Sequence, residues 1–348
     1  MVLLGPIQRA DHVGSFLRYP EVLKARLDAL IGSISPEALR QIQDEAIKKV
    51  IQAQVGNGLV TLTDGEQRRD LFHLDFLARV GGVETADMSV GPDGKTVPPH
   101  LKITGKLHHN QDIQVADFLF LQLQTKQYPG CIPKVCIPSP TMLHFRTGRA
   151  GIDMTAYPNL DTFMDDLVQV YRAEIKALYD AGCRYIQLDD TNLAYLCDPK
   201  MRAEAAQRGE NPDALPHTYA KLLNRVLEDR PDGLRGGYEP IAETLFKEFD
   251  VDTYFLEFDD ERSGGFKSLR FVPEGKIVVL GLVTSKFPKL ESKEAIKARI
   301  KEATEYCPLD RLALSPQCGF SSSHHDNKLS MEEQWAKIRL VVEIAKEV

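Results

Sequence analysis

Short apolar runs alternate with longer amphipathic segments along most of the chain. Runs rich in β-branched and aliphatic residues predict strands at 59–63, 133–137, 185–188, 253–256, 277–280 and 312–314. Apolar spacing of helical period predicts helices at about 36–55, 160–181, 216–229, 239–248, 292–305 and 331–347. Such alternation is typical of a parallel sheet, and no glycine-rich phosphate loop follows the first strand. We therefore expect an α/β fold, a (β/α)8 TIM-type barrel.

One strand of this barrel is hard to find. A further strand at about 6–11 brings the count to seven, whereas a barrel of this class closes with eight. Only residues 231–237 separate the helix that ends near Arg230 from Tyr238-Glu-Pro240, which is typical of the start of a helix. Seven residues are too few for two turns and a strand of about five or six residues. We expect a barrel strand to be missing near 235–236: either the barrel is unusual, or a segment belongs between Arg235 and Gly236.

The remainder of the chain indicates a single catalytic barrel domain over 1–348. Residues 81–109 contain Gly91-Pro-Asp-Gly94 and Pro98-Pro99, which predict an inserted loop or hairpin. We find no internal repeat and no linker between domains.

Composition narrows the classes of function. The 348 residues carry a formal charge of -7 with basic and acidic residues interspersed, so a nucleic-acid partner is not expected. No apolar run approaches the roughly 18 residues that cross a bilayer, and residues 1–4 are too short for a signal-peptide core. The six cysteines form no CxxC pair, so we expect thiols rather than a disulfide framework. A cytoplasmic enzyme without a membrane partner is the expectation.

Two potential metal ligands follow predicted strands. Cys318 lies in a Pro/Gly-bounded turn after 312–314, and Glu257 directly follows the apolar strand 253–256. The carboxyl ends of barrel strands carry the catalytic groups in this fold, and thiolate and carboxylate are both zinc ligands. Each residue has a simpler interpretation: a buried cysteine behaving as a small hydrophobe, and a carboxylate in an ordinary buried ion pair.

Other polar groups follow the remaining strand ends. Gly14 permits close backbone approach and Ser15 offers a hydroxyl, although serine at this place is also a helix N-cap. Glu66 could receive a substrate ammonium group, or else belong to a solvated cluster with Arg68 and Arg69. Asp189 and Asp190 point to opposite faces of their strand. We favour Asp189 as the functional carboxylate, with a structural capping role as the alternative.

Taken together, these motifs resemble those of the cobalamin-independent methionine synthase family, in particular short relatives of its C-terminal catalytic barrel. The resemblance covers nearly the whole chain and rests on five motifs in order: Val13-Gly-Ser15, Asp64-Gly-Glu66, Ile186-Gln-Leu-Asp-Asp190, Glu257 and Ser315-Pro-Gln-Cys-Gly319.

The resemblance implies a zinc-dependent transfer of a methyl group to a thiol, with homocysteine as the expected acceptor and methionine as the product. It implies Glu257 and Cys318 as two zinc ligands, and Ser15 with the backbone of Val13 and Gly14 as the carboxylate site. Glu66 and Asp189 would receive the ammonium group as catalytic residues. Zinc activates such a reaction because it lowers the pKa of the bound thiol.

The family's other two zinc ligands come from a His-x-Cys motif on the fifth strand, and no His-x-Cys occurs in this chain. Family resemblance and strand counting therefore point to the same gap. His324 and His325, on the loop after Cys318, are potential substitute ligands. The methyl donor is open, because the chain has one barrel: methyl-tetrahydrofolate, a methylated corrinoid and another small methylated compound all fit.

Two further interpretations remain. A metal-dependent hydrolase would use Asp11, His12, Asp189 and Asp190, although the first strand lacks the His-x-His that places two imidazoles on one face. A catalytically silent barrel that binds an amino acid or a partner would follow from loss of part of the zinc site.

Overall fold

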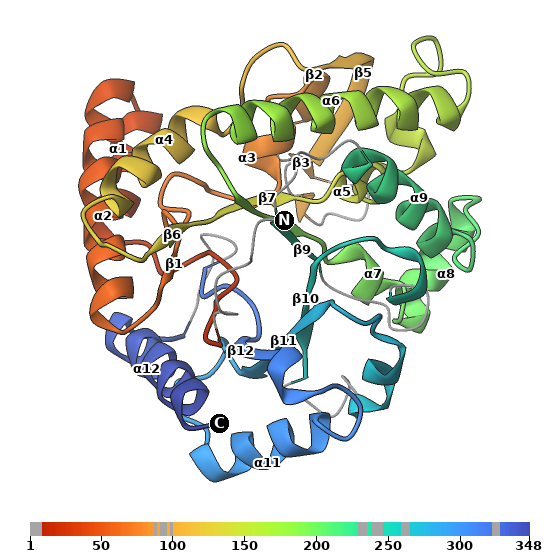
Figure 1. The fold of residues 1–348 in the computed structure, drawn as a ribbon. Coiled ribbons are helices and arrows are strands. Elements are labelled where there is room, and N and C mark those ends of the chain that lie inside the picture. The colour runs from red at the N-terminus through yellow and green to blue at the C-terminus, as the bar shows by residue number, and fades with distance from the viewer. Residues whose placement is uncertain are drawn as a thin grey trace.

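A parallel sheet forms the centre of the molecule (Figure 1). The computed structural model describes residues 9–86, 89–90, 96–97, 100–228, 235–238, 246–258, 265–321 and 328–348. Six strands pair in the order β12-β11-β10-β9-β8-β7, every neighbouring pair being parallel. Their bounds are β7 Val135–Pro138, β8 Tyr185–Asp189, β9 Arg235–Tyr238, β10 Thr253–Glu257, β11 Ile277–Val283 and β12 Leu312–Pro316.

Two further segments extend this sheet on either side. β1 (Thr61–Leu62) pairs in parallel with β6 (Ile132–Pro133), and Lys134 alone separates β6 from β7. At the other edge, the N–H of Asp11 donates to the carbonyl of Leu314 in β12 at 3.0 Å. No strand pairing joins residues 9–11 to β1 in the part of the chain that the structure describes, so a closed ring of strands is not shown.

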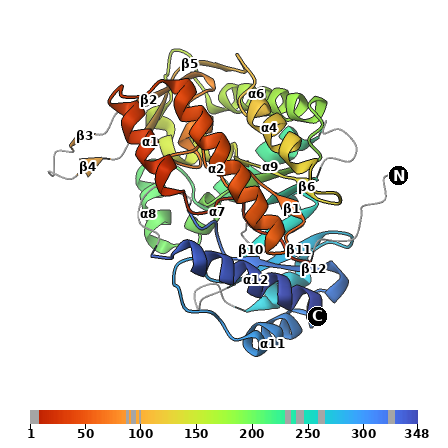
Figure 2. The ribbon, with the colours of Figure 1, turned by 90° about the vertical axis from the view of Figure 1, so that its left-hand side faces the viewer.

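Helices cover the outside of the strands (Figures 1 and 2). The predicted helices at 36–55, 160–181, 292–305 and 331–347 are confirmed as α2 (Pro36–Gly56), α6 (Leu160–Asp180), α11 (Lys293–Ala303) and α12 (Met331–Glu347). Each begins where a serine or asparagine side chain accepts a helical N–H, as Ser35 does from Ala38. The others are α1 (Pro20–Leu30), α3 (Leu74–Leu77), α4 (Val115–Thr125), α5 (Thr141–Thr147), α7 (Asn192–Tyr195), α8 (Pro199–Gln207) and α9 (Leu215–Leu227), with short 3-10 turns at Arg149–Gly151, Phe266–Phe271 and Leu309–Arg311.

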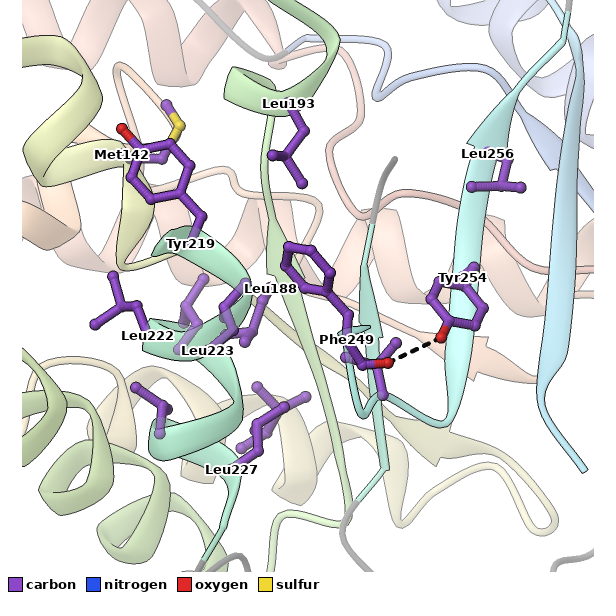
Figure 3. Close-up of a cluster of buried hydrophobic side chains, with 14 of the residues drawn as sticks. Met142, Leu188, Leu193, Tyr219, Leu222, Leu223, Leu227, Phe249, Tyr254 and Leu256 are labelled. Carbon is purple, nitrogen blue, oxygen red and sulfur yellow. Dashed lines mark hydrogen bonds between the residues drawn. The ribbon is translucent and has the colours of Figure 1, made fainter. Parts of the chain in front are cut away.

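The core lies between the strands and the helices. Figure 3 shows Leu222, Leu223 and Leu227 of α9 beside Leu188 of β8, and all four are buried. Burying a leucine side chain contributes about 1.5–3 kcal/mol, so such contacts hold the helices against the sheet. The Tyr254 hydroxyl of β10 donates to the carbonyl of Phe249 at 3.0 Å, which fixes the entry to that strand.

The expected loss of a strand near 235–236 is wrong. β9 lies between β8 and β10, pairing Gly236 with Ile186 and Gly237 with Thr253. The prediction fails because it requires a strand of about five residues, whereas β9 has four and continues into Tyr238, the expected start of a helix. Residues 239–245 of that helix lie outside the described residues, and 246–248 are helical.

Two antiparallel pairs of strands lie outside the six-stranded sheet, within the segment 81–109 where the sequence predicts an inserted loop or hairpin. β2 (Gly81–Ala86) pairs antiparallel with β5 (His100–His108), and β3 (Ser89–Val90) pairs antiparallel with β4 (Thr96–Val97). The β3–β4 pair projects from the body in Figure 2.

The six cysteines form no disulfide. Among the described helices, none is both long and apolar enough to span a bilayer.

Candidate functional site

Two carboxylates and a thiol meet at the carboxyl ends of the strands. Glu66 follows β1, Cys136 lies in β7 and Asp189 ends β8, and one ligand atom from each lies within 4.8 Å of the other two. The register of β7 and β8 produces this meeting: Cys136 pairs with Gln187 and Pro138 with Asp189. Since alternate strand residues share a face, Cys136, Gln187 and Asp189 can gather on one side.

Glu66 has an unusual backbone and an unusual environment. Its φ of 55° is in the left-handed region, and it is the one described non-glycine residue with a positive φ. Such a conformation costs of order 1 kcal/mol or more and is common at functional sites. The side chain is 3% exposed. Its Oε1 lies 3.5 Å from Nη1 of Arg69, whereas Oε2 is buried without a hydrogen-bond partner. The second oxygen is therefore available to a ligand.

Burial changes the ionisation of the whole cluster. Burial, together with the nearby Glu66 carboxylate, raises the pKa of Asp189 to about 7. Burial also raises the pKa of Glu66 and holds the pKa of the Cys136 thiol well above its usual range. A positively charged group of a ligand would relieve the electrostatic repulsion between the two carboxylates. The electrostatics thus suit an ammonium group or a metal ion.

A hydrogen-bonded relay holds Asp189 in place. The Gln187 amide donates from Nε2 to Asp189 Oδ1 at 2.6 Å and to the Val13 carbonyl at 3.0 Å. The fully buried Lys134 ammonium donates to Gln187 Oε1 at 3.1 Å and to Asp11 Oδ1 at 2.9 Å. Because an ammonium group only donates, Lys134 fixes the Gln187 oxygen toward itself and turns the NH₂ group toward Asp189.

Gly14 forms a wall of the same cluster. Its φ is +115°, and a Cβ at this position would lie 2.5 Å from the Cys136 sulfur and 3.4 Å from Glu66 Oε1. Only glycine tolerates both constraints. Its N–H already donates to His12 Nδ1 at 3.2 Å, and the Val13 carbonyl accepts from Gln187 and from the Cys136 thiol. The expected carboxylate site at Val13 and Gly14 thus has part of its backbone engaged within the protein.

Ser15 connects the first strand end to the loop that carries Cys318. Its hydroxyl accepts from the N–H of Ser321 at 3.4 Å, and a Cβ on Gly319 would lie 1.8 Å from that oxygen. The helix-cap alternative for Ser15 is wrong, since Tyr19 is the N-cap of α1. Ser15 therefore orders the loop after β12.

The two expected zinc ligands lie at the carboxyl ends of β10 and β12, and β11 lies between these two strands. Glu257 ends β10, and its Oε2 accepts from Nε2 of Gln317, the neighbour of Cys318, at 2.7 Å. Among the described residues, no third histidine, cysteine or carboxylate gathers with this pair into a group suited to a metal. β9 supplies only Arg, Gly, Gly and Tyr, and His324 and His325 lie outside the described residues. The described residues thus do not make a complete zinc site at Glu257 and Cys318.

The residues of the hydrolase alternative have structural partners. His12 contacts the Thr61 carbonyl through Nε2 and the Gly14 N–H through Nδ1, and burial lowers its pKa to about 4. Asp11 accepts from Lys134 and from the Tyr185 hydroxyl. Asp190 accepts from Thr141 and from the N–H of Asn192, the first residue of α7. This geometry does not favour the hydrolase.

Cys136 and Arg69 are the site residues that the sequence reasoning missed. Cys136 lies in the predicted strand 133–137, two residues from the polar Lys134, and this spacing is the signal that could have placed it on the inner face. The alternative that puts Arg69 in a solvated charge cluster is wrong, since Arg69 is buried and donates to the Cys136 carbonyl.

Comparison with known proteins identifies the family. The family model "Cobalamin-independent synthase, Catalytic domain" matches residues 9–209 and 236–347. The uncharacterized Bacillus subtilis protein YxjH is 41% identical and aligns over 98% of this chain and 94% of its own length. A solved Listeria monocytogenes protein, classed provisionally as a vitamin-B12-independent methionine synthase, is 37% identical, with a TM-score of 0.82 and 99% and 98% coverage. The Pyrococcus horikoshii methionine synthase is 24% identical over 90% of this chain and 86% of its own.

These alignments also concern the segment around Arg235 and Gly236. The alignment with YxjH runs over 361 positions, more than the 348 residues of this chain, so YxjH contains residues that have no counterpart here. The family match is interrupted from 210 to 235 and resumes at Gly236, beside the junction where the His-x-Cys motif was sought. β9 is thus present as a strand but brings no zinc ligand. With a family model that matches most of its length, this chain belongs to the catalytic-domain family of the cobalamin-independent methionine synthases.

Proposed function

We propose that this protein binds a thiol amino acid, most simply homocysteine, by its ammonium group, and that it transfers a methyl group to the thiol. The observation that carries the proposal is the pair Glu66 and Asp189: the buried carboxylate of Glu66 and the half-buried carboxylate of Asp189 lie within 4.8 Å of each other and of Cys136. Family membership supplies the reaction class, since the family consists of methionine-synthase-type methyltransferases.

Recognition of the head group rests on charge. An α-ammonium group between Glu66 and Asp189 supplies the positive charge that the two carboxylates lack, and the partnerless Oε2 of Glu66 can accept one of its hydrogens. Arg69, 3.5 Å from Glu66 Oε1, holds the other oxygen. Ser15 and the backbone at Val13 and Gly14 are the proposed neighbours of the substrate carboxylate. The carboxylate pair disfavours a thiol compound that lacks the amino group.

The thiol of the substrate is proposed to lie toward Cys318. Ser15 connects Gly14 to the loop after β12, and Gln317 connects Cys318 to Glu257, so one continuous chain of contacts leads from the ammonium site to both residues. The family typically uses zinc. In this chain Glu257 and Cys318 are the proposed ligands, and they are two where zinc takes four. The proposal therefore rests on the ammonium site rather than on a bound metal.

The methyl donor is proposed only as a class. Methyl-tetrahydrofolate, a methylated corrinoid and another small methylated compound are each compatible with a single barrel. Thr284, whose hydroxyl lies 3.3 Å from Gln317 Oε1, is the proposed contact on the donor side.

A second function is a barrel that binds the amino acid without catalysis. The residues of YxjH that have no counterpart here, together with the lack of a histidine or cysteine in β9, favour it. Both functions share the ammonium site, and only the first requires Cys318.

Calorimetric titration tests the shared part. We expect L-homocysteine and L-methionine to bind. The thiol 4-mercaptobutanoate is homocysteine without its amino group, and we expect it to bind at least about 30-fold more weakly. This factor corresponds to a cost of about 2 kcal/mol for leaving a buried charge unpaired. Equal affinity for the two thiols would contradict the proposal. Methyl transfer by the wild type that is lost in Cys318→Ala would support the catalytic function, whereas its absence from the wild type with every donor class would support the binding-only function.

A further inference from the structure

The Glu66, Cys136 and Asp189 cluster has a donor set that an ammonium group does not need. Two carboxylates would be sufficient for an amine, but the third group is a thiol, which is a soft ligand typical of zinc and its heavier congeners. The three donors come from three different strand ends. Glu66 is 3% exposed, and its Oε2 is buried without a hydrogen-bond partner.

The geometry is close to that of a three-ligand metal site. The ligand atoms lie within 4.8 Å of one another. Zinc bonds of about 2.0–2.3 Å place donor atoms about 3.5 Å apart, so the side chains need to close by about 1 Å. Gln187 holds Asp189, and the missing Cβ of Gly14 leaves room for the Cys136 sulfur, so two of the donors are already positioned.

We infer that Glu66, Cys136 and Asp189 bind one thiophilic divalent cation, and that this cation and the substrate ammonium exclude each other. On binding, the Cys136 thiol gives up its proton to solvent and its sulfur becomes an anionic ligand, while the fourth tetrahedral position is left to solvent. Metal binding here does not depend on Glu257 or Cys318. The exclusion of amino acid rests on the proposed function, whereas the metal site itself does not.

Arg69 limits the affinity of this site. Its Nη1 lies 3.5 Å from Glu66 Oε1, so a cation must bind against a neighbouring positive charge. Lys134 is one step further away, since it reaches Asp189 only through Gln187. The site is therefore expected to take up and release its cation rather than hold it permanently.

Cadmium is the probe for the metal site, because each cadmium–thiolate bond gives an ultraviolet charge-transfer band. Cd²⁺ is titrated into the reduced full-length protein after chelator treatment, with circular dichroism to verify folding. We expect one cadmium band in the wild type, its loss in Cys136→Ser, and its retention in Cys318→Ser and in Cys197→Ser, which removes an exposed thiol. Asp189→Asn should weaken cadmium binding at least tenfold and serves as the test if Cys136→Ser does not fold.

Retention of the band in Cys136→Ser, or its loss in Cys318→Ser, would overturn the metal site. L-methionine is then added to the cadmium-loaded wild type, where the band should fall as the amino acid displaces the cation. If methionine binds to the protein in the presence of chelator but leaves the cadmium band unchanged, the cation and the amino acid bind at separate sites, and the inference that they exclude each other is wrong. If methionine fails to bind in chelator while the Cys136-dependent band remains, the proposed function fails and the metal site stands.

Discussion

The affinity for an amino acid should depend on pH through Asp189. In the ligand-free protein the pKa of this carboxyl is about 7, because burial and the neighbouring Glu66 both disfavour its ionised form. An ammonium ligand needs the ionised carboxylate, so binding must first remove the proton. Affinity for L-methionine should therefore fall as the pH is lowered through 7.

The size of the effect follows from a single titration. With a pKa of about 7, about half of Asp189 is ionised at pH 7 and about a tenth at pH 6, so the dissociation constant should increase about fivefold over that unit. From pH 7 to pH 8 the affinity should gain less than about twofold. The raised pKa of Glu66 makes the fall at low pH steeper, because the apparent values belong to the coupled pair.

Calorimetry at several pH values measures this dependence, and at pH 7 buffers of different ionisation enthalpy should show about half a proton released per ligand bound. Asp189→Asn is the matched control: it removes the titrating group, so its weakened binding should lose most of the pH dependence. An affinity that is flat between pH 6 and pH 7 in the wild type, or the same slope in Asp189→Asn, would refute the reasoning.

Three further predictions concern stability. Gly14→Ala should lower the free energy of unfolding by about 1–3 kcal/mol, because the new Cβ would lie 2.5 Å from a buried thiol sulfur. Gly130→Ala is the control, since this glycine also has a positive φ but has nothing within 4 Å of the added Cβ; denaturant unfolding should show a smaller loss for it. Lys134→Met should lower the free energy of unfolding by about 3–5 kcal/mol, because it leaves its buried partners unpaired, whereas Lys176→Met removes an exposed ion pair and should lower it by under about 1 kcal/mol in the same assay. Similar losses in the two variants would contradict the structural role given to Lys134. Since the pKa of Asp189 is raised from 3.8 to about 7 in the folded state, its contribution to the stability of the ligand-free protein should be complete below pH 3.8 and be lost progressively as the pH rises from there through about 7. Thermal unfolding should show this trend weakened in Asp189→Asn, and an unchanged trend would contradict it.

The order of strands and helices could be predicted because it depends on local patterns. α2 and α6 begin at good N-caps and carry a helical apolar face, so their predicted ends lie within a few residues of the observed ones. β9 could not be found in this way. It has two glycines in four residues and no apolar alternation, and it is a strand because β8 and β10 offer their edges to it.

The candidate site is predictable to the level of strand ends and no further. The sequence pairs Glu66 with Asp189 because their strands end on one side, and the structure brings them together. The spacing of Cys136 from Lys134 indicates only which face of the strand it shares, and its meeting with Asp189 depends on the register with Gln187, which the sequence does not give. The contact of the Ser15 hydroxyl with Gly319 joins residues about 300 positions apart, and no local pattern encodes it.

A crystal structure with L-methionine bound tests the central claim most directly. The account predicts the ligand nitrogen within about 2.7–3.2 Å of a carboxylate oxygen of both Glu66 and Asp189, with the ligand sulfur toward Cys318. A ligand nitrogen in contact with neither carboxylate, in a site that is otherwise occupied, would contradict it.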